Sequence, residues 1–224
     1  MTTSKTTTSA QPKIGERTRS YLLQAALDEF SARGFDAATI RDIAARAQLS
    51  HGMVRYHYET KERLWFATIA FLFERFAREM AYTKEELETA KGDELELFRI
   101  WLRKYVHYCA RHPEHARIVM QESVEFSPRL EKAIDEHLRE GHKRVRQNFE
   151  RFKNLGLFPK SVPPESLVYI ITGACQNIFM LAPESRLTFG YDPMTDKAIN
   201  AHADAIIAIF CPETPVKPTR LRKR

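Results

Sequence analysis

The sequence has few cysteines and no long apolar run. Its three cysteines, Cys109, Cys175 and Cys211, lie far apart within helical patterns. They match neither a disulfide framework nor a paired metal motif, and we expect them to act as small buried apolar residues. No run of about eighteen apolar residues occurs, so no membrane span is expected. The first residues are rich in Thr and Ser without an apolar segment, which argues against a secretory signal and favours a cytoplasmic protein.

Signatures of enzyme sites are also missing. The sequence has no Gly-rich phosphate loop, no G-x-S-x-G motif and no grouping of Ser, His and an acid beyond chance. Cys109, His112 and His115 have a spacing that would suit zinc, but Pro113 interrupts the helix that would align them, and no second cluster completes the ligand shell. We therefore expect no catalytic residue, no metal and no cofactor.

The formal charge of +6 is unevenly distributed. Residues 1–63 carry ten Lys or Arg against seven Asp or Glu, and residues 64–212 carry twenty against twenty-one. Residues 213–224 carry five against one. A neutral body with basic ends is consistent with a nucleic-acid partner, although charge alone is weak support.

Residues 39–61 contain two short helical patterns joined by a tight turn. Thr39 can cap the first helix, while Asp42, three positions on, reaches back to the N–H of the cap. Gln48 lies in the turn, and Ser50 is placed to cap the second helix. This spacing predicts a helix-turn-helix, whose second helix is presented to the DNA major groove.

Helix pairs with an apolar inner face are common in all-α proteins, so the pattern alone leaves DNA binding open. The outer face favours DNA, because cations, hydroxyl groups and aromatic edges suit phosphates and bases, whereas a merely solvated helix more often carries Glu, Lys and Gln. The residues expected at the DNA are Thr39, Arg41, Ser50, His51, Gly52, Arg55, Tyr56, His57 and Lys61. Phosphate contacts are expected from Thr39, Tyr56, His57 and Lys61, and base contacts from His51, Gly52 and Arg55.

The same stretch resembles the DNA-binding domain of TetR-family transcriptional regulators. The resemblance spans about Arg17 to Leu64 and rests on Gly34-Phe35, Thr39–Ala44, Leu49-Ser50, Tyr56–Tyr58, Thr60–Glu62 and Leu64. The sequence departs from the family at Gln48, where Gly is frequent, and at Arg55, where Tyr is frequent. An Arg in a recognition helix can bind guanine O6 and N7 together, so operator sequence is the property least safely transferred from the family.

This resemblance implies an all-α protein of about nine helices with two domains. A three-helix DNA-binding domain is expected at residues 13–63, and a helical effector-binding and dimerisation domain at 64–212. A disordered arm at 1–12 and a basic disordered tail at 213–224 flank them.

Apolar periodicity and helix-breaking residues outline the elements around these boundaries. A first helix is expected from about residue 16 to 32, stopped by Gly34, and residues 82–92 read as a helix end or loop. Further helices are predicted over residues 61–80, 93–112, 114–124, 127–155, 163–181 and 199–210, with a long connection over 183–196.

The last two predicted helices carry wide apolar stripes. We expect them to bury these stripes against a second copy of the chain in a four-helix interface, as the family does. The alternative is that the stripes cover the core of their own protomer. The residues concerned are Leu167, Ile171, Ala174, Ile178, Ile199, Ala203, Ile206 and Phe210.

Aromatic residues concentrate on the helices that in this family enclose a ligand. An aromatic pocket with a few polar groups would suit a small apolar or aromatic effector, while the alternative is that these residues fill a solid core. The candidate pocket residues are Trp101, Tyr105, Tyr108, Met120, Phe126, Phe149, Tyr169, Gln176 and Phe179.

Together these features predict a homodimeric repressor that binds a double-stranded DNA operator and is released by a small-molecule effector. An activator, or a regulator indifferent to small molecules, remains an alternative. A helical carrier or enzyme with a vestigial DNA-binding domain is a more distant one.

Overall fold

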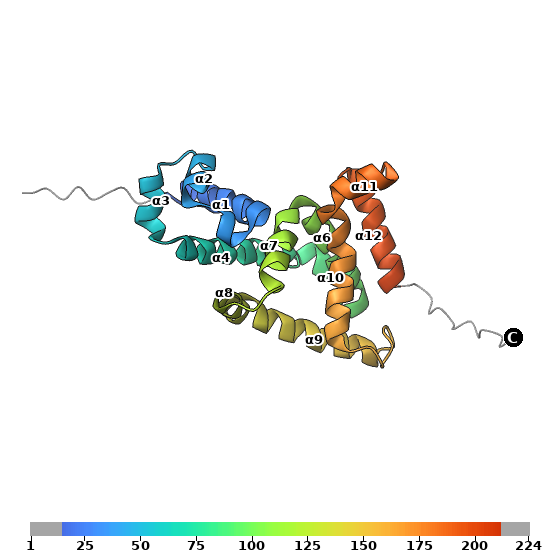
Figure 1. Ribbon diagram of the computed structural model, residues 1–224. Coiled ribbons are helices and arrows are strands. Elements are labelled where there is room, and N and C mark those ends of the chain that lie inside the picture. Colours follow the sequence, from blue (N-terminus) through green and yellow to red (C-terminus); the bar gives the residue numbers. More distant parts are fainter. Residues whose placement is uncertain (1–14, 212–224) are drawn as a thin grey trace, which may run out of the picture. The chain divides into compact units, whose positions relative to one another are not determined.

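The computed structural model describes residues 15–211. The expected arm at 1–12 and tail at 213–224 lie outside this range. Within it the regular elements are twelve α-helices and one π-helical turn, η1, so the all-α prediction is confirmed (Figure 1). The chain divides into two compact units after Thr68, inside a helix, whereas the sequence placed its domain boundary after residue 63.

The first unit contains α1 (Glu16–Ala37), α2 (Ile40–Arg46), α3 (His51–Tyr58) and the start of α4 (Lys61–Met80). Helix α2 packs against both α1 and α3. The core is formed by fully buried apolar side chains, each of which stabilises the fold by roughly 1.5–3 kcal/mol. They include Leu22, Leu23, Leu27, Phe30, Ile43, Val54 and Leu64.

Gly34 interrupts α1 as the sequence predicts, but the helix does not end there. Its backbone adopts φ 76° and ψ 170°, a conformation open mainly to glycine, and a short helical segment continues to Ala37. The first helix is therefore kinked at Gly34 rather than stopped.

The second unit contains the rest of α4 and the elements that follow it (Figure 1). These are α5 (Lys84–Ala90), α6 (Glu94–Arg111), α7 (Pro113–Ser123), α8 (Pro128–Ala133), η1 (Ile134–Leu138), α9 (Arg139–Asn154), α10 (Pro164–Met180), α11 (Ala182–Phe189) and α12 (Asp196–Phe210). Helix α6 is central, because it packs against α5, α7, α10 and α12. Its Leu102 and Val106 are fully buried.

Two segments predicted as connections are helical, which raises the number of helices above the expected nine. Helix α5 forms because Thr83 and Glu86 make a reciprocal capping box, and each side chain accepts the backbone N–H of the other. Helix α11 ends at Gly190, whose left-handed conformation provides a C-cap. Both signals are present in the sequence. The polar composition of residues 82–92 and the two prolines of residues 183–196 nevertheless favour a loop prediction.

The helix expected over residues 127–155 is divided by η1. The N–H of Arg139 bonds the carbonyl of Ile134, five residues back, which widens the turn and offsets the apolar periodicity on its two sides. Among the described residues, no single helix has the length and apolar content to cross a membrane. Only α10 and α11 taken together, with 69° between them, have both.

Candidate DNA-binding and effector sites

The two short helices of the first unit are capped much as the sequence predicts. Thr39 Oγ1 accepts the N–H of Asp42 at 3.1 Å, and Ser50 Oγ accepts the N–H of Met53 at 3.2 Å. The Asp42 carboxylate, however, accepts the hydroxyl of Thr39 at 2.8 Å instead of the N–H of the cap. The two caps fix where α2 and α3 begin, and so which side chains α3 presents outward.

The turn between α2 and α3 places Gln48 in the left-handed region, with φ 57°. The Gln48 N–H donates to the carbonyl of Ala45 at 3.1 Å, and the Leu49 N–H donates to that of Ala44 at 2.9 Å. This conformation favours glycine, so Gln48 carries local strain of about 1 kcal/mol.

Helix α3 has one buried and one exposed face. Val54 is fully buried against the first unit, whereas His51, Gly52, Arg55 and Tyr56 are exposed. A Cβ placed on Gly52 would meet open space, so nothing within the protomer requires a glycine there. The exposed face therefore offers the guanidinium of Arg55, the hydroxyl of Tyr56 and the imidazole of His51, while Gly52 has no side chain to hinder close approach. These groups suit contact with DNA.

The arginines of this unit fall into paired and unpaired sets. Arg33 and Arg46 both pair with Glu29, at 2.9 and 3.2 Å, and this carboxylate is almost fully buried between α1 and α2. Arg41 and Arg55 are exposed, and no ion pair to either is found among the described residues. The first two arginines therefore hold the fold, while Arg41 and Arg55 are available to an anionic partner.

Lys61 and His57 are less available than the sequence suggested. Lys61 Nζ donates to the carbonyls of Asp36 and Ala38, at 3.0 and 3.2 Å, and lies 4.5 Å from the centre of the Phe35 ring. The Nε2 atom of His57 is buried and makes no hydrogen bond. Thr39, Arg41 and Ser50, in contrast, are exposed as a DNA contact requires.

The predicted effector pocket does not form a single cluster in the second unit. Tyr105 donates its hydroxyl to Gln176 Oε1 at 3.2 Å and stacks on Trp101, so these side chains join α6 to α10 inside a packed core. Tyr108, Phe149 and Phe179 are also buried there. Three other candidates are exposed, Phe126 fully, Tyr169 by 76% and Met120 by 49%. The sequence could not separate the buried candidates from the exposed ones, because helical periodicity does not say which helix covers a given face.

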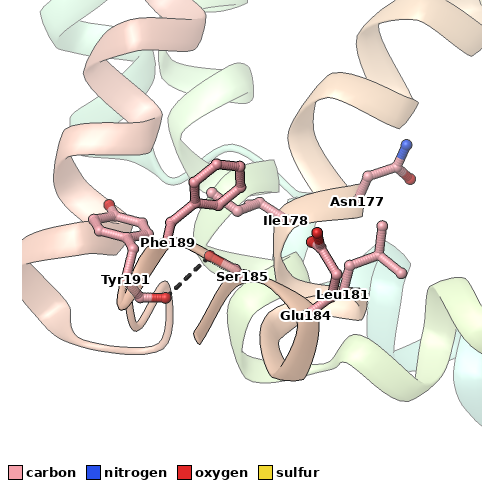
Figure 2. Close-up of a pocket in the computed structure, with 7 residues that line it drawn as sticks. All are labelled: Asn177, Ile178, Leu181, Glu184, Ser185, Phe189 and Tyr191. Atoms are coloured by element: carbon pink, nitrogen blue, oxygen red, sulfur yellow. Dashed lines mark hydrogen bonds between the residues drawn. The ribbon is translucent and has the colours of Figure 1, made fainter. Parts of the chain in front are cut away.

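A hollow of about 510 Å³ opens elsewhere, between α10 and α11 (Figure 2). Its lining is mainly apolar, and the Ser185 hydroxyl within it donates to the carbonyl of Tyr191 at 3.0 Å. The lining residues are Asn177, Ile178, Leu181, Glu184, Ser185, Phe189 and Tyr191. Of these, the sequence predicts a role only for Ile178, at the dimer interface.

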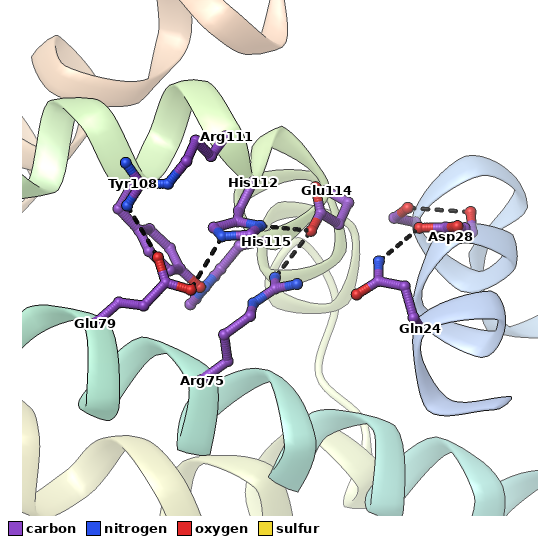
Figure 3. A network of polar contacts seen from close by, with 10 residues as sticks. Gln24, Asp28, Arg75, Glu79, Tyr108, Arg111, His112, Glu114 and His115 are labelled. Atoms are coloured by element: carbon purple, nitrogen blue, oxygen red, sulfur yellow. Dashed lines mark hydrogen bonds and ion pairs between the residues drawn. The ribbon is translucent and has the colours of Figure 1, made fainter. Parts of the chain in front are cut away.

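A charged cluster that the sequence does not predict joins α4 to the corner between α6 and α7 (Figure 3). Arg75 pairs with Glu114 at 2.8 Å, and Glu79 accepts from Arg111 at 2.9 Å. Helix α4 carries several charged residues, Arg75 and Glu79 among them, but nothing near them in the sequence indicates their partners. His112 and His115 belong to this region and are engaged by Glu79 and Tyr108, respectively. No group of three His, Cys, Asp or Glu residues suited to a metal ion occurs within residues 15–211.

Comparisons with known proteins agree with the helix-turn-helix geometry. Residues 22–68 match the model of bacterial regulatory proteins of the tetR family, and residues 91–180 match the model of the tetracyclin repressor-like C-terminal domain. Together the two matches cover more than half of the chain. The chain belongs to the TetR family.

Individual relatives of this TetR-family chain match parts of it. The HTH-type transcriptional repressor Rv3405c of Mycobacterium tuberculosis is 42% identical over 67 residues, which are 30% of this chain and 36% of the relative. The repressor NicS of Pseudomonas putida is 30% identical over 125 residues, 55% of this chain and 56% of NicS. The chain thus matches only about a third to a half of the length of these relatives.

A solved structure has the same fold over nearly its whole length. AibR, crystallised with isovaleryl coenzyme A and operator DNA, superposes with a TM-score of 0.66 at 18% identity, covering 88% of this chain and 99% of AibR. At this identity the likeness concerns the fold of the TetR-family chain and not its ligand.

The apolar stripe predicted for the TetR-type dimer faces largely inward. Leu167, Ile171, Ile199, Ala203 and Ile206 are buried in the core of their own protomer, so within it they cannot form a surface for a second copy. Ala174, Ile178 and Phe210 are half-buried. The alternative, that these stripes cover the protomer's own core, holds for the buried residues.

The outer faces of the same helices carry a different apolar set. Ile170 on α10 is 51% exposed and Ile209 on α12 is 69% exposed, and further exposed apolar side chains lie nearby in sequence. These are Tyr169, Leu181, Leu187, Phe189 and Tyr191.

Proposed function

We propose that the chain is a sequence-specific transcriptional repressor that binds operator DNA as a homodimer and is released by a small-molecule effector. The observation that carries this proposal is the outward face of α3, on which Arg55 is exposed and unpaired beside His51, Gly52 and Tyr56. The caps at Thr39 and Ser50 support it, because they hold α2 and α3 in the helix-turn-helix arrangement.

The relatives support repression as the regulatory outcome. Rv3405c and NicS are both named repressors, and AibR was crystallised with an acyl-coenzyme A and with operator DNA. They are named as regulators, which favours a chain without enzymatic activity. An operator as partner also implies a cytoplasmic location.

The DNA contacts divide by chemistry. His51, Gly52 and Arg55 are assigned to base edges, and Thr39, Arg41, Ser50 and Tyr56 to phosphates. Lys61 is assigned a supporting role, because its bonds to Asp36 and Ala38 join the end of α1 to the start of α4.

Dimerisation is expected through the exposed faces of α10 and α12. Half-sites about 34–36 Å apart require two recognition helices, one from each protomer. The exposed apolar side chains of these helices provide the surface that a symmetric contact between identical copies would bury.

The first experiment measures DNA binding directly. Binding of the purified chain to DNA from upstream of its own gene is followed by fluorescence anisotropy over a series of salt concentrations, with a random duplex as control. We expect saturable binding that favours the upstream DNA by at least about a thousandfold. Equal and steeply salt-dependent binding to both duplexes would show that only phosphates are contacted, and would contradict the proposal.

A further inference from the structure

A buried cluster of charged and aromatic side chains joins α4 to the corner between α6 and α7 (Figure 3). Only 7% of the Arg75 side chain and 14% of the Glu114 side chain are exposed, and their ion pair measures 2.8 Å. His112 lies between two carboxylates, with Nε2 3.2 Å from Glu79 and Nδ1 3.4 Å from Glu114. The α6–α7 corner is thus connected to α4 by two acidic residues, one on each side.

Stability alone does not account for this arrangement. The free-energy cost of removing two charges from water is about as large as the attraction between them. Apolar side chains of the same volume would therefore often hold the helices equally well. The neighbouring core of this unit is made of apolar side chains such as Leu102 and Val106. Arg75 and Glu114 therefore call for a role other than packing.

Aromatic rings enclose the cation. The Arg75 guanidinium lies 6.0 Å from the ring centres of both Phe71 and Tyr108, within reach of cation–π attraction. Tyr108 Oη and His115 Nδ1 share a hydrogen bond of 2.7 Å. Phe76 contacts the rings of Tyr108 and His115, at 5.1 and 5.3 Å. The groups around the Arg75 guanidinium are thus mainly planar aromatic rings.

The aromatic rings around Arg75 form a cage, and beside it the Nε2 atom of His137 has no hydrogen-bond partner. His137 stacks on Phe73, whose ring also makes a perpendicular contact with His115, and the Nε2 atom of His137 is buried without a hydrogen bond. The residue lies in η1, and π-helical turns inside helices are frequent at functional sites. The Glu136 carboxylate lies 3.9 Å from Nε2, beyond hydrogen-bond distance, so this buried atom can still donate to an acceptor.

The charges of the cluster indicate what that acceptor is. Burial lowers the pKa of His115 to about 3 and raises that of Tyr108 to about 12, so both are neutral near pH 7. Glu79 and Glu114 already accept from Arg111, His112 and Arg75. These two carboxylates belong to the cluster, and that of Glu136 lies 3.9 Å from His137 Nε2, so an anion can bind Arg75 only in exchange for the carboxylate of Glu114.

We propose that this cluster binds the effector and that the effector is a small carboxylic acid with an apolar or aromatic body, whose carboxylate replaces Glu114 on Arg75. The body of the acid lies against Phe73 and Phe76, and His137 Nε2 donates to its carboxylate. Glu114, once displaced, stays paired with the neighbouring His112. This inference rests on the proposed function, since it names the ligand that would regulate the repressor.

The replacement of Glu114 by the acid on Arg75 explains how effector binding would be transmitted to α4. Arg75 belongs to α4 and Glu114 to the first turn of α7, so their ion pair is a direct tie between the two helices. An acid that takes Arg75 binds only the state in which this tie is open, and it therefore shifts the population toward that state. Helix α4 follows the recognition helix α3 directly in the chain, after two residues.

The test compares acids with their neutral amides on the full-length protein. Phenylacetate and hexanoate are titrated against phenylacetamide and hexanamide by isothermal titration calorimetry. We expect at least one acid to bind about tenfold or more tightly than its amide, because only the acid makes a charge-assisted bond with Arg75. Equal binding of acid and amide, or no binding of either acid, would overturn the proposal.

Glu114→Gln provides the decisive variant. It removes the internal competitor while leaving a side chain that still accepts from Arg75, so we expect the acid to bind about tenfold more tightly than to the wild type. A role confined to structure would leave affinity unchanged or lower it, and misfolding cannot raise it. An affinity that stays the same or falls contradicts the proposed exchange.

Further variants locate the contacts. Arg75→Gln combined with Glu114→Gln keeps a neutral pair and should abolish the preference for acid over amide. His137→Phe keeps the stack on Phe73 and should weaken acid binding by about threefold to tenfold, the loss of one hydrogen bond. Arg146→Gln, at an exposed pair with Glu165, is the matched control and should change nothing.

Operator binding is measured on the same samples to separate the two proposals. Specific operator binding that none of the acids affects would contradict the effector inference and leave the repressor proposal standing. Acid binding with the expected response to Glu114→Gln, but without specific DNA binding, would leave the site standing and contradict the proposed function.

Discussion

Gln48 shows how a single residue can carry strain at a functional turn. Its φ of 57° lies in the left-handed region, where a Cβ crowds the backbone, while its N–H and that of Leu49 are both hydrogen-bonded. The hydrogen bonds and the packing of α2 against α3 hold the residue there. Glycine would adopt the same conformation without this crowding.

Gln48→Gly should therefore stabilise the protein. We expect a gain of about 0.5–1 kcal/mol in the free energy of unfolding, because relief of strain exceeds the added flexibility of the unfolded chain. Urea unfolding measures it. Gln48→Ala, which retains a Cβ, is the control and should show no such gain; equal stabilities of the two variants would mean that the turn is unstrained.

His115 makes stability depend on pH. Burial lowers its pKa from the ordinary 6.5 to about 3, so the folded protein keeps the ring neutral where the unfolded chain binds a proton. The unfolded state therefore takes up more protons between pH 6.5 and 3. Stability from this group is fully present above pH 6.5 and is lost as the pH falls toward 3.

Lowering the pH from 8 to 5 should cost the wild type about 2 kcal/mol through His115. His115→Asn keeps a polar group within reach of Tyr108. Its free energy of unfolding should fall by about 2 kcal/mol less than that of the wild type over the same pH interval. Urea unfolding at both pH values and one protein concentration gives the comparison. Burial also lowers the pKa of His142 and His202, but both proteins contain them, so identical losses would refute the role of His115.

At the scale of the element, α3 separates fold from recognition on its two faces. Val54 is buried and fixes the helix in the first unit, whereas Arg55 is exposed beside it. A substitution on the outer face can therefore change DNA recognition without disturbing the core.

Arg55→Ala should reduce discrimination at one position in each half-site by about 1–3 kcal/mol and spare affinity for random DNA. Anisotropy with the operator and with single-base variants measures the change. Arg117→Ala, at an exposed arginine of the second unit, is the control. Equal losses on specific and random DNA would reassign Arg55 to a phosphate.

Lys61 differs in kind from Arg55. Because its Nζ bonds the carbonyls of Asp36 and Ala38, Lys61→Ala should weaken binding to all sequences alike and also lower the melting temperature. Unchanged melting would show that these bonds contribute little.

At the scale of the whole molecule, the outer faces of α10 and α12 present apolar surface that its own protomer does not cover. Ile170 and Ile209 are both more than half exposed, while the inner faces of the same helices fill the core. Solvent exposure of such surface is unfavourable, so a second copy is the partner we propose for it.

Ile170→Glu combined with Ile209→Glu should convert the dimer to a monomer in sedimentation equilibrium. Operator affinity should fall by about 100-fold or more, because each half-site is then bound separately. Leu155→Glu places the same charge at an exposed apolar residue of another segment, 71% exposed, and should leave the dimer intact. A double variant that remains dimeric would place the interface elsewhere.

Features set by neighbouring residues could be predicted from the sequence by itself. The caps at Thr39 and Ser50, the turn at Gln48 and the break at Gly34 each depend on hydrogen bonds or backbone sterics within a few residues. The helix-turn-helix and the all-α fold followed from them, because a helix is determined largely by its caps and its apolar period.

Only the tertiary structure decided which face of each helix is internal and which distant residues meet. The periodicity of α10 and α12 predicts an apolar face, but α6 covers the one that contains Ile171 and Ala203 and leaves Ile170 and Ile209 outside. Arg75 and Glu114 are far apart in the chain, so nothing local signals their pairing. Such contacts depend on how helices pack against one another, and packing depends on the whole unit at once.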